Sequence, residues 1–222
     1  MTTVAVIQPY FFPYAGYFRL FAAADVVAMF DCVQFPRRGW VHRNRFALAS
    51  GELDWLTLPL AKADRDVRID DLHWSADAPA RLNANLRRFP ELENERDSEL
   101  VRHVLDLSNP DVAGYLSERV TGVAARLGLP TPIVRSSALP IDPTLRAQDR
   151  VIAIVQALGG TRYVNPSGGR ELYNHESFNR AAIELRFLTP YANSMESMLS
   201  RLLREAPDAI AAEIRRETVL VA

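Results

Sequence analysis

The chain has 222 residues, a formal net charge of −1, 48% hydrophobic residues and 24% charged residues. This composition is ordinary for a globular protein with one large core or two small ones, and the near-neutral charge argues against a general nucleic-acid binder. The single cysteine, Cys32, excludes an internal disulfide, and no apolar run is long enough for a signal peptide or a membrane span. We therefore expect a cytoplasmic protein.

The first elements predict a parallel sheet. Val4–Gln8 has the pattern of a buried strand, Tyr17–Ala24 that of a short helix, and Val26–Asp31 that of a second strand. A strand, a loop, a helix and a strand within about thirty residues make a βαβ unit.

A polar, arginine-rich loop is expected over residues 32–46, followed by strands at Trp55–Leu60 and Val67–Trp74. Residues 77–127 then show helical spacing, and their last helix is predicted to start with Asn109 as its cap and Pro110 in its first position.

The remaining chain returns to alternating elements. In order, the pattern predicts strand Pro132–Arg135, helix 142–158, strand Thr161–Val164, helix Phe178–Ala182, strand Ile183–Leu188 and a helical stretch Met195–Arg216 broken near Pro207. We expect one α/β domain over residues 1–222, Rossmann-like, with a mostly parallel sheet flanked by helices and a helical insertion around 77–127.

The segment between the first strand and the first helix is unusually aromatic. Phe11, Phe12 and Phe18 are expected to pack in the core. Tyr10, Tyr14 and Tyr17 carry hydroxyls that a core does not need, and Gly16 permits close backbone approach. A loop in this position often holds a ligand, and tyrosine can donate hydrogen bonds to a phosphate or an oxyanion.

A second polar segment follows the second strand. Asp31 should emerge at the same sheet edge as the first loop, and the residues after it are rich in planar hydrogen-bonding groups and arginines. Those that we consider for ligand contact are Gln34, Arg38, Trp40, Arg43, Asn44 and Arg45. A merely solvated loop is the alternative.

A third segment, Tyr163–Tyr173, places Asn-Pro-Ser-Gly-Gly-Arg after a strand. This is a possible second anion cradle, with a plain turn as the alternative. Its candidate ligand contacts are Asn165, Ser167, Gly168 and Arg170. The four histidines show no metal-ligand spacing, so no metal site is expected, and nothing in the sequence points to a cofactor.

The motifs IQPYFFPYAGYF at 7–18, D-x-V-Q-F at 31–35 and R-R-G-W-x-x-R-N-R at 37–45, with WLTLPL at 55–60, resemble the WbqC-like protein family. The resemblance covers most of the chain. It implies a place in the synthesis of O-antigen, other surface glycans or secondary metabolites. It also implies the glycine (aminoacyl) transferase activity that has been suggested for some members. The chain departs from the family pattern at Asp31-Cys32, where the family reads Asp-Asp, and at Asn165-Pro166, where it reads Ser-Gly.

The segment Tyr14–Tyr17, Y-A-G-Y, also occupies the place of the H-x-G-H motif of HIGH-type nucleotidyltransferases. Tyrosine keeps a hydrogen-bond donor there, but with a pKa near 10 it is not a cation at neutral pH. The likeness therefore implies a shared fold class with altered or lost adenylation chemistry.

Together these features predict a group transferase that moves an activated acyl or aminoacyl unit to a sugar or small metabolite. Asp31 is the expected base, Tyr14 and Tyr17 would orient the reacting oxygen, and Gln8 and Asn44 would fix the acceptor. Arg38, Arg43 and Arg45 would hold an anionic, phosphate-bearing or carboxylate-bearing substrate. A nucleotidyltransferase and a non-catalytic ligand-binding protein remain the alternatives.

Overall fold

The centre of the computed structural model, which describes residues 1–222, is a six-stranded sheet with the order β5-β2-β1-β6-β7-β8. All neighbouring strands run parallel except β8, which pairs antiparallel with β7. The strands are β1 (Thr3–Ile7), β2 (Val26–Met29), β5 (Ile133–Arg135), β6 (Arg162–Asn165), β7 (Glu184–Leu188) and β8 (Leu220–Val221).

The five parallel strands follow the spatial order third, second, first, fourth, fifth along the chain, which is the Rossmann-like order. In such sheets ligands bind beyond the carboxyl ends of the strands, where the strand order reverses. The reversal here lies between β1 and β6. The predicted α/β fold with a mostly parallel sheet is thus confirmed.

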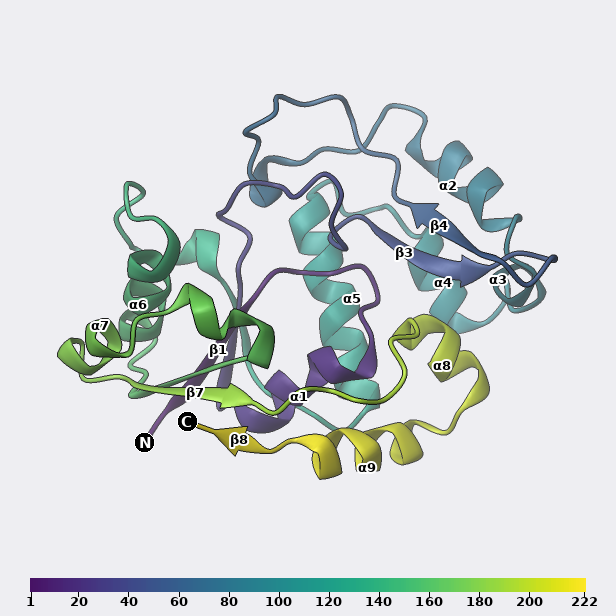
Figure 1. Cartoon of the computed structure of the whole chain (residues 1–222). Coiled ribbons are helices and arrows are strands. Elements are labelled where there is room, and N and C mark those ends of the chain that lie inside the picture. Colours follow the sequence, from purple (N-terminus) through teal and green to yellow (C-terminus); the bar gives the residue numbers. More distant parts are fainter.

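Helices cover both faces of this sheet (Figure 1). Successive strand residues point to opposite faces, so Ala5 joins the larger core while Val4 and Val6 join the smaller one. The larger core includes α1 (Ala15–Ala23), α5 (Val112–Arg126), α8 (Met198–Arg204) and α9 (Pro207–Glu217), and the smaller one α6 (Ala147–Ala157) and α7 (His175–Arg180). No helix is long and apolar enough to span a bilayer.

Most of the chain between β2 and β5 forms a lobe beside the sheet (Figure 1), and the apolar residues of this lobe belong to the same larger core as α1. It starts with an antiparallel hairpin, β3 (Arg43–Ala47) and β4 (Leu53–Thr57), which pairs Arg45 with Trp55. The hairpin is followed by the 3-10 turn η1 (Ile69–Asp71), then by α2 (Ala78–Leu86), α3 (Pro90–Asn94), α4 (Glu99–Leu105) and α5. The helical insertion predicted around 77–127 is therefore present.

Several local expectations need correction. Residues 43–47 are a strand rather than loop, because alternate side chains at Asn44 and Phe46 are buried under the hairpin. Residues 67–74 form no strand; they make only isolated bridges and a 3-10 turn. The helix expected to start at Asn109-Pro110 begins at Val112, because Asp111 supplies the cap through its hydrogen bond with the Gly114 N–H.

The other boundaries shift by a few residues. Helix α6 starts at Ala147 rather than at 142, and the break expected near Pro207 separates α8 from α9. Two short 3-10 turns follow strands at the carboxyl edge of the sheet: η2 (Ser136–Ala138) after β5 and η3 (Ser167–Leu172) after β6.

Candidate functional site

The loop after β1 is held in place by the hairpin. The side-chain amide of Asn44 donates to the carbonyl oxygens of Phe11 at 3.0 Å and Phe12 at 2.7 Å. The Phe11 N–H donates to the carbonyl of Trp40 at 3.0 Å, and the Ser197 hydroxyl donates to that of Phe12 at 3.0 Å. These bonds hold Phe12 at φ 46°, a left-handed conformation that a bulky residue rarely adopts without such support.

This arrangement opens a cleft that we call the aromatic cleft. It consists of two adjoining cavities of about 40 and 560 Å³, which share Trp40, Asn44 and Met195. The smaller cavity is lined in addition by Tyr10, Pro13 and Tyr14. The larger one extends past Arg45 to the start of α3 and to α8, with Glu91, Glu196, Ser200 and Arg204 among its polar lining.

Two phenols in the smaller cavity have no hydrogen-bond partner within the chain: those of Tyr10 and Tyr14. Burial raises the pKa of both groups; the neighbouring Tyr14 raises the pKa of Tyr10 further, and Arg19 partly offsets the rise for Tyr14. Both phenols therefore keep their protons at neutral pH. They are available as hydrogen-bond donors to an oxygen atom of a ligand.

A stack of tryptophans and arginines forms the adjoining wall. The rings of Trp40 and Trp55 lie 5.0 Å apart, and the Arg43 guanidinium sits 4.0 Å from the centre of the Trp55 ring. Arg45 lies 5.5 Å from the Trp40 ring, is exposed, and makes no hydrogen bond or ion pair through its guanidinium. Arg45 is thus a free cation on a rigid aromatic support, while Arg43 donates to the carbonyls of Arg38 and Gly39 and fixes the loop.

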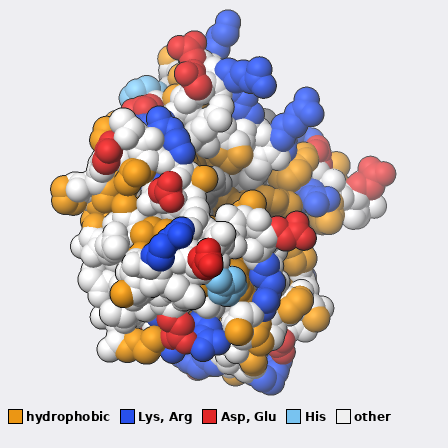
Figure 2. Space-filling view, turned by 60° about the vertical axis from the view of Figure 1, so that its left-hand side comes forward, with side chains coloured by type: hydrophobic (Ala, Val, Ile, Leu, Met, Phe, Trp, Pro, Cys, Tyr) orange, Lys and Arg blue, Asp and Glu red, His pale blue; other side chains and the backbone are white.

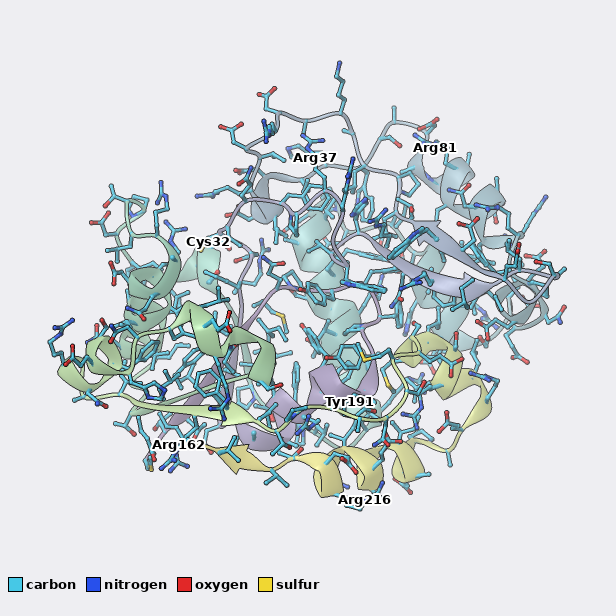
Figure 3. The ribbon with its side chains drawn as sticks, viewed as in Figure 1. Cys32, Arg37, Arg81, Arg162, Tyr191 and Arg216 are labelled. Atoms are coloured by element: carbon cyan, nitrogen blue, oxygen red, sulfur yellow. The ribbon has the colours of Figure 1, made fainter.

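Gly16, in the first turn of α1, lies directly under the wall of the cleft. A Cβ there would overlap the Tyr14 ring and come within 2.7 Å of Tyr191. The Tyr191 hydroxyl donates to Glu213 at 2.5 Å, and Glu213 pairs with the buried Arg201 at 2.8 Å. Figure 3 shows Tyr191 against the start of α1. The space at Gly16, where we expected a ligand to approach the backbone, is therefore filled by two tyrosine rings, and Gly16 lines neither cavity of the cleft.

Tyr17 is placed differently from Tyr10 and Tyr14. Its side chain is 2% exposed, and its hydroxyl donates to the Gln8 carbonyl at 2.9 Å. Burial, followed by the neighbouring Tyr10, raises the pKa of Tyr17 well above its usual value. Its phenol is committed to the backbone and lines neither cavity of the cleft.

Asp31 is fully buried at the carboxyl end of β2. Its two carboxylate oxygens accept four hydrogen bonds, from Arg135 Nε at 2.6 Å, the Ser136 hydroxyl at 2.9 Å, the Ser137 N–H at 2.8 Å and the Ser137 hydroxyl at 2.7 Å. Arg135 also pairs with Asp111 at the cap of α5. The carboxylate therefore ties β2 to β5 and, through Arg135, to α5.

Other predicted site residues lie outside the aromatic cleft. Gln34 is exposed, and its side-chain amide donates to the Arg65 carbonyl at 3.0 Å. Arg38 is also exposed. The side chain of Gln8 makes no hydrogen bond within the chain. None of the three lines either cavity. No three His, Cys, Asp or Glu side chains converge in a way that could hold a metal ion.

The segment after β6 is a separate feature. Asn165 is buried and accepts from the Tyr163 hydroxyl at 3.1 Å, and Gly169 leaves room for its amide. Arg170 lies 4.8 Å from the centre of the Phe187 ring. Ser167 and Gly168 follow at the carboxyl end of β6. Neither they nor Asn165 and Arg170 line the aromatic cleft.

A larger open groove of about 920 Å³ runs along α5 beside β5. Its polar side chains mostly bond to one another or to nearby backbone: Asn109 donates to Glu118, and Thr131 donates to the Phe21 carbonyl. Arg135, at its end, is already paired with two carboxylates. The groove thus offers few free polar groups, whereas the aromatic cleft offers several.

Part of the cleft could not be found by sequence reasoning. Met195, Glu91 and Arg204 belong to segments without a distinctive motif, and they reach the cleft only because α3 and α8 pack beside the hairpin. No sequence signal marks these residues; Met195 stands out only in the structure, as a large apolar residue that is 61% exposed.

Comparisons with known proteins identify the family of the chain. The model of the WbqC-like protein family matches residues 8–196. The uncharacterized protein Rv1507c of Mycobacterium tuberculosis is 23% identical over 191 residues, covering 83% of this chain and 81% of its own length. No solved structure matches. The family match spans the loop after β1, the hairpin and the segment at Met195, and the chain therefore belongs to the WbqC-like protein family.

Proposed function

We propose that this protein is a group transferase that binds a small anionic substrate in the aromatic cleft and moves an acyl or aminoacyl unit to a sugar or small-metabolite acceptor. The observation that carries the proposal is the pair of unpartnered, protonated phenols of Tyr10 and Tyr14 beside the free guanidinium of Arg45. Acyl transfer develops negative charge on the carbonyl oxygen, which such donors stabilise.

In this reaction the bond between the acyl carbon and its leaving group breaks, and a bond from that carbon to the acceptor nitrogen or oxygen forms. The proton of the acceptor leaves with the departing group. Tyr10 and Tyr14 would donate to the acyl oxygen, and Arg45 would hold a carboxylate or phosphate of the substrate. Trp40 would provide a flat face for a ring or a chain.

The roles first expected for Tyr17 and Asp31 change within this proposal. Tyr17 supports the loop through the Gln8 carbonyl, and Tyr10 takes its place as the second donor. Asp31 has no exposed surface and accepts four hydrogen bonds, so we assign it the positioning of Arg135 rather than proton removal. The carboxylates that line the cleft are those of Glu91, which accepts from the Ser200 hydroxyl, and Glu196, which pairs with Arg204.

The test combines a ligand screen with matched variants. Thermal shift and calorimetry with N-acetylglycine, glycinamide, AMP and a non-hydrolysable glycyl-adenylate would identify the binding probe, and mass spectrometry of amine and alcohol acceptors would detect transfer. Tyr10→Phe, Tyr14→Phe and Arg45→Ala should each weaken probe binding or turnover by about tenfold or more.

Tyr173→Phe is the control, because this half-buried phenol lies outside the cleft and bonds to Tyr163. If all three cleft variants bind the probe as strongly as the wild type, the placement of the site is refuted. Release of pyrophosphate from ATP would instead identify an adenylating enzyme, and tight binding without conversion would identify a ligand-binding protein.

A further inference from the structure

A separate pocket of about 290 Å³ lies between the loop after β2, the end of β4 and α2. Its apolar lining includes Phe35, Leu58, Leu60 and Leu72, and its polar lining consists of Arg37, His42, Thr57, Arg81 and Asn85. No aspartate or glutamate is among the lining residues, in contrast to the aromatic cleft, which includes Glu91 and Glu196. The two sites share no residue.

Two arginines come to this pocket from different elements. Arg37 is exposed, and one of its terminal nitrogens donates to the carbonyls of Ala63 at 2.7 Å and Asp64 at 2.5 Å. Its Nε and other terminal nitrogen have no partner in the chain. The guanidinium is therefore held in place and still has N–H groups free to bind a ligand. Arg81, on α2, has only a long, exposed ion pair of 3.7 Å to Asp77.

Figure 3 shows Arg37 and Arg81 on the same upper side of the molecule, one on the loop and one on α2. Lys and Arg side chains also gather at the upper end of the face seen in Figure 2. Acidic side chains lie among them in that view, so the positive charge of the pocket itself comes from Arg37 and Arg81, which favour the approach of an anion.

His42 adds an unusual feature to the wall. Its Nδ1 is buried without a hydrogen-bond partner, and its ring meets Phe35 edge-on with the centroids 4.9 Å apart. Burial, followed by the charge of Arg43, lowers the pKa of His42 to about 4, so the imidazole is neutral at pH 7. A neutral imidazole has one N–H donor and one bare nitrogen. An unpaired buried polar atom of this kind is uncommon in folded proteins and calls for an explanation, and a polar ligand in the pocket would supply one.

We propose that this pocket binds the phosphate group of a small phosphorylated metabolite. Two guanidinium groups from opposite sides match the double negative charge of a phosphate monoester, and planar guanidinium forks suit its oxygens. The Thr57 hydroxyl, the Asn85 amide and the His42 imidazole can bind hydroxyl or phosphate oxygens, and none of these side chains is hydrogen-bonded within the chain.

The size of the pocket limits the ligand. Small-molecule sites span roughly 300 to 1,000 Å³, and the 290 Å³ here corresponds to the small end of that range. A phosphorylated amino acid, sugar or glycerol fits this volume better than a dinucleotide. Since Trp40 and Asn44 of the aromatic cleft flank His42 in the chain, the same rigid segment supports both sites.

The experiment titrates the full chain with inorganic phosphate, glycerol 3-phosphate and O-phosphoserine, followed by calorimetry and by NMR of the histidine ring protons. The His42 signal is assigned from its loss in His42→Gln. We expect saturable binding of a monoester with a dissociation constant on the order of 1 mM or tighter, together with a shift of the His42 signal.

Arg37→Ala and Arg81→Ala should each weaken monoester binding by about tenfold, and the double variant should abolish it. Arg87→Ala is the matched control, because it removes an exposed arginine at the end of α2 that lines no part of the pocket. Circular dichroism of each variant checks the fold.

Inorganic phosphate that binds as tightly as the monoesters would assign the site to free phosphate rather than to a phosphorylated metabolite. Absence of saturable binding of all three probes, or a double variant that binds within about twofold of the wild type, would overturn the proposal. Because the pocket shares no residue with the aromatic cleft, failure here leaves the proposed transferase site unaffected, and the reverse also holds.

Discussion

The side-chain amide of Asn44 lies 2.7 Å from the carbonyl oxygen of Phe12 and connects the hairpin of the inserted lobe to the loop after the first strand. This contact spans 32 residues of sequence and is buried. It stabilises a backbone at φ 46° that is unfavourable for phenylalanine. The walls of the aromatic cleft, one from each segment, are therefore fixed relative to each other before any ligand binds.

Replacing Asn44 by Ala should destabilise the protein by about 2 kcal/mol, because the Phe11 and Phe12 carbonyls lose buried donors. The melting temperature should fall by roughly 6 °C for a chain of this size. Urea unfolding measures the change. Ser194→Ala, at an exposed position on the rim of the cleft, is the control. A stability equal to that of the control would show that the two bonds do not hold the loop.

Gly16→Ala should disturb the cleft without unfolding the protein. The new methyl group overlaps the Tyr14 ring and lies 2.7 Å from Tyr191, so both rings must move, at a cost of about 1–3 kcal/mol. Probe binding in the cleft should fall with it. Gly122→Ala on α5 is the matched control, since its Cβ meets nothing within 4 Å, and it should stabilise the helix by about 0.5–1 kcal/mol. If Gly16→Ala binds the probe as strongly as the wild type, Tyr14 is not part of the binding site.

The three tyrosines of the first loop should respond differently to loss of their hydroxyls. Tyr17→Phe should cost about 1 kcal/mol of stability, because the Gln8 carbonyl loses its buried donor. Tyr10→Phe and Tyr14→Phe should change stability by less than about 0.5 kcal/mol, since their hydroxyls have no partner. Parallel denaturation curves test this pattern, and a large loss of stability in Tyr14→Phe would contradict it.

Alkaline pH should destabilise the folded state through the tyrosines. The pKa of every one of the seven is raised above the usual value of 10.0, mainly by burial. The unfolded chain releases these protons near that value while the folded chain retains them, so this contribution to stability is complete below pH 10 and is lost as the pH rises further.

Phenolate absorbance during a pH titration measures this effect. The folded protein should show little phenolate at pH 10, and the signal should rise together with the loss of helical circular dichroism. Early titration of several tyrosines in a protein that is still folded would show that their hydroxyls are more exposed than the structure indicates.

Asp31→Ala should lower stability by about 3 kcal/mol, because it leaves Arg135 with one partner and removes the four hydrogen bonds of a buried carboxylate. Turnover per folded molecule should stay close to that of the wild type. Asp31→Asn, which keeps the shape and part of the hydrogen bonding, should be intermediate. A variant that keeps wild-type stability but loses turnover would return Asp31 to the chemistry as a base.

The sequence was sufficient for the fold class, because apolar runs of strand and helix length are local and their order requires a parallel sheet. It also marked the loop after β1 and the segment around Trp40 as candidates, because their density of aromatic and guanidinium groups is visible without a structure. The strand at residues 43–47 was missed because the polar Asn44 occupies one of its buried positions between two arginines. The alternation of buried and exposed side chains therefore does not appear as an alternation of apolar and polar residues.

Which polar groups are free was decided only by the tertiary structure. Tyr10, Tyr14 and Tyr17 are equivalent in sequence, but only Tyr17 reaches a backbone carbonyl. Asp31 is saturated by Arg135 and Ser137, which lie 104 and 106 residues further along the chain. A hydrogen bond depends on positions in space rather than on separation in sequence, so the sequence determined the candidate residues while folding determined which of them keep unpaired polar groups.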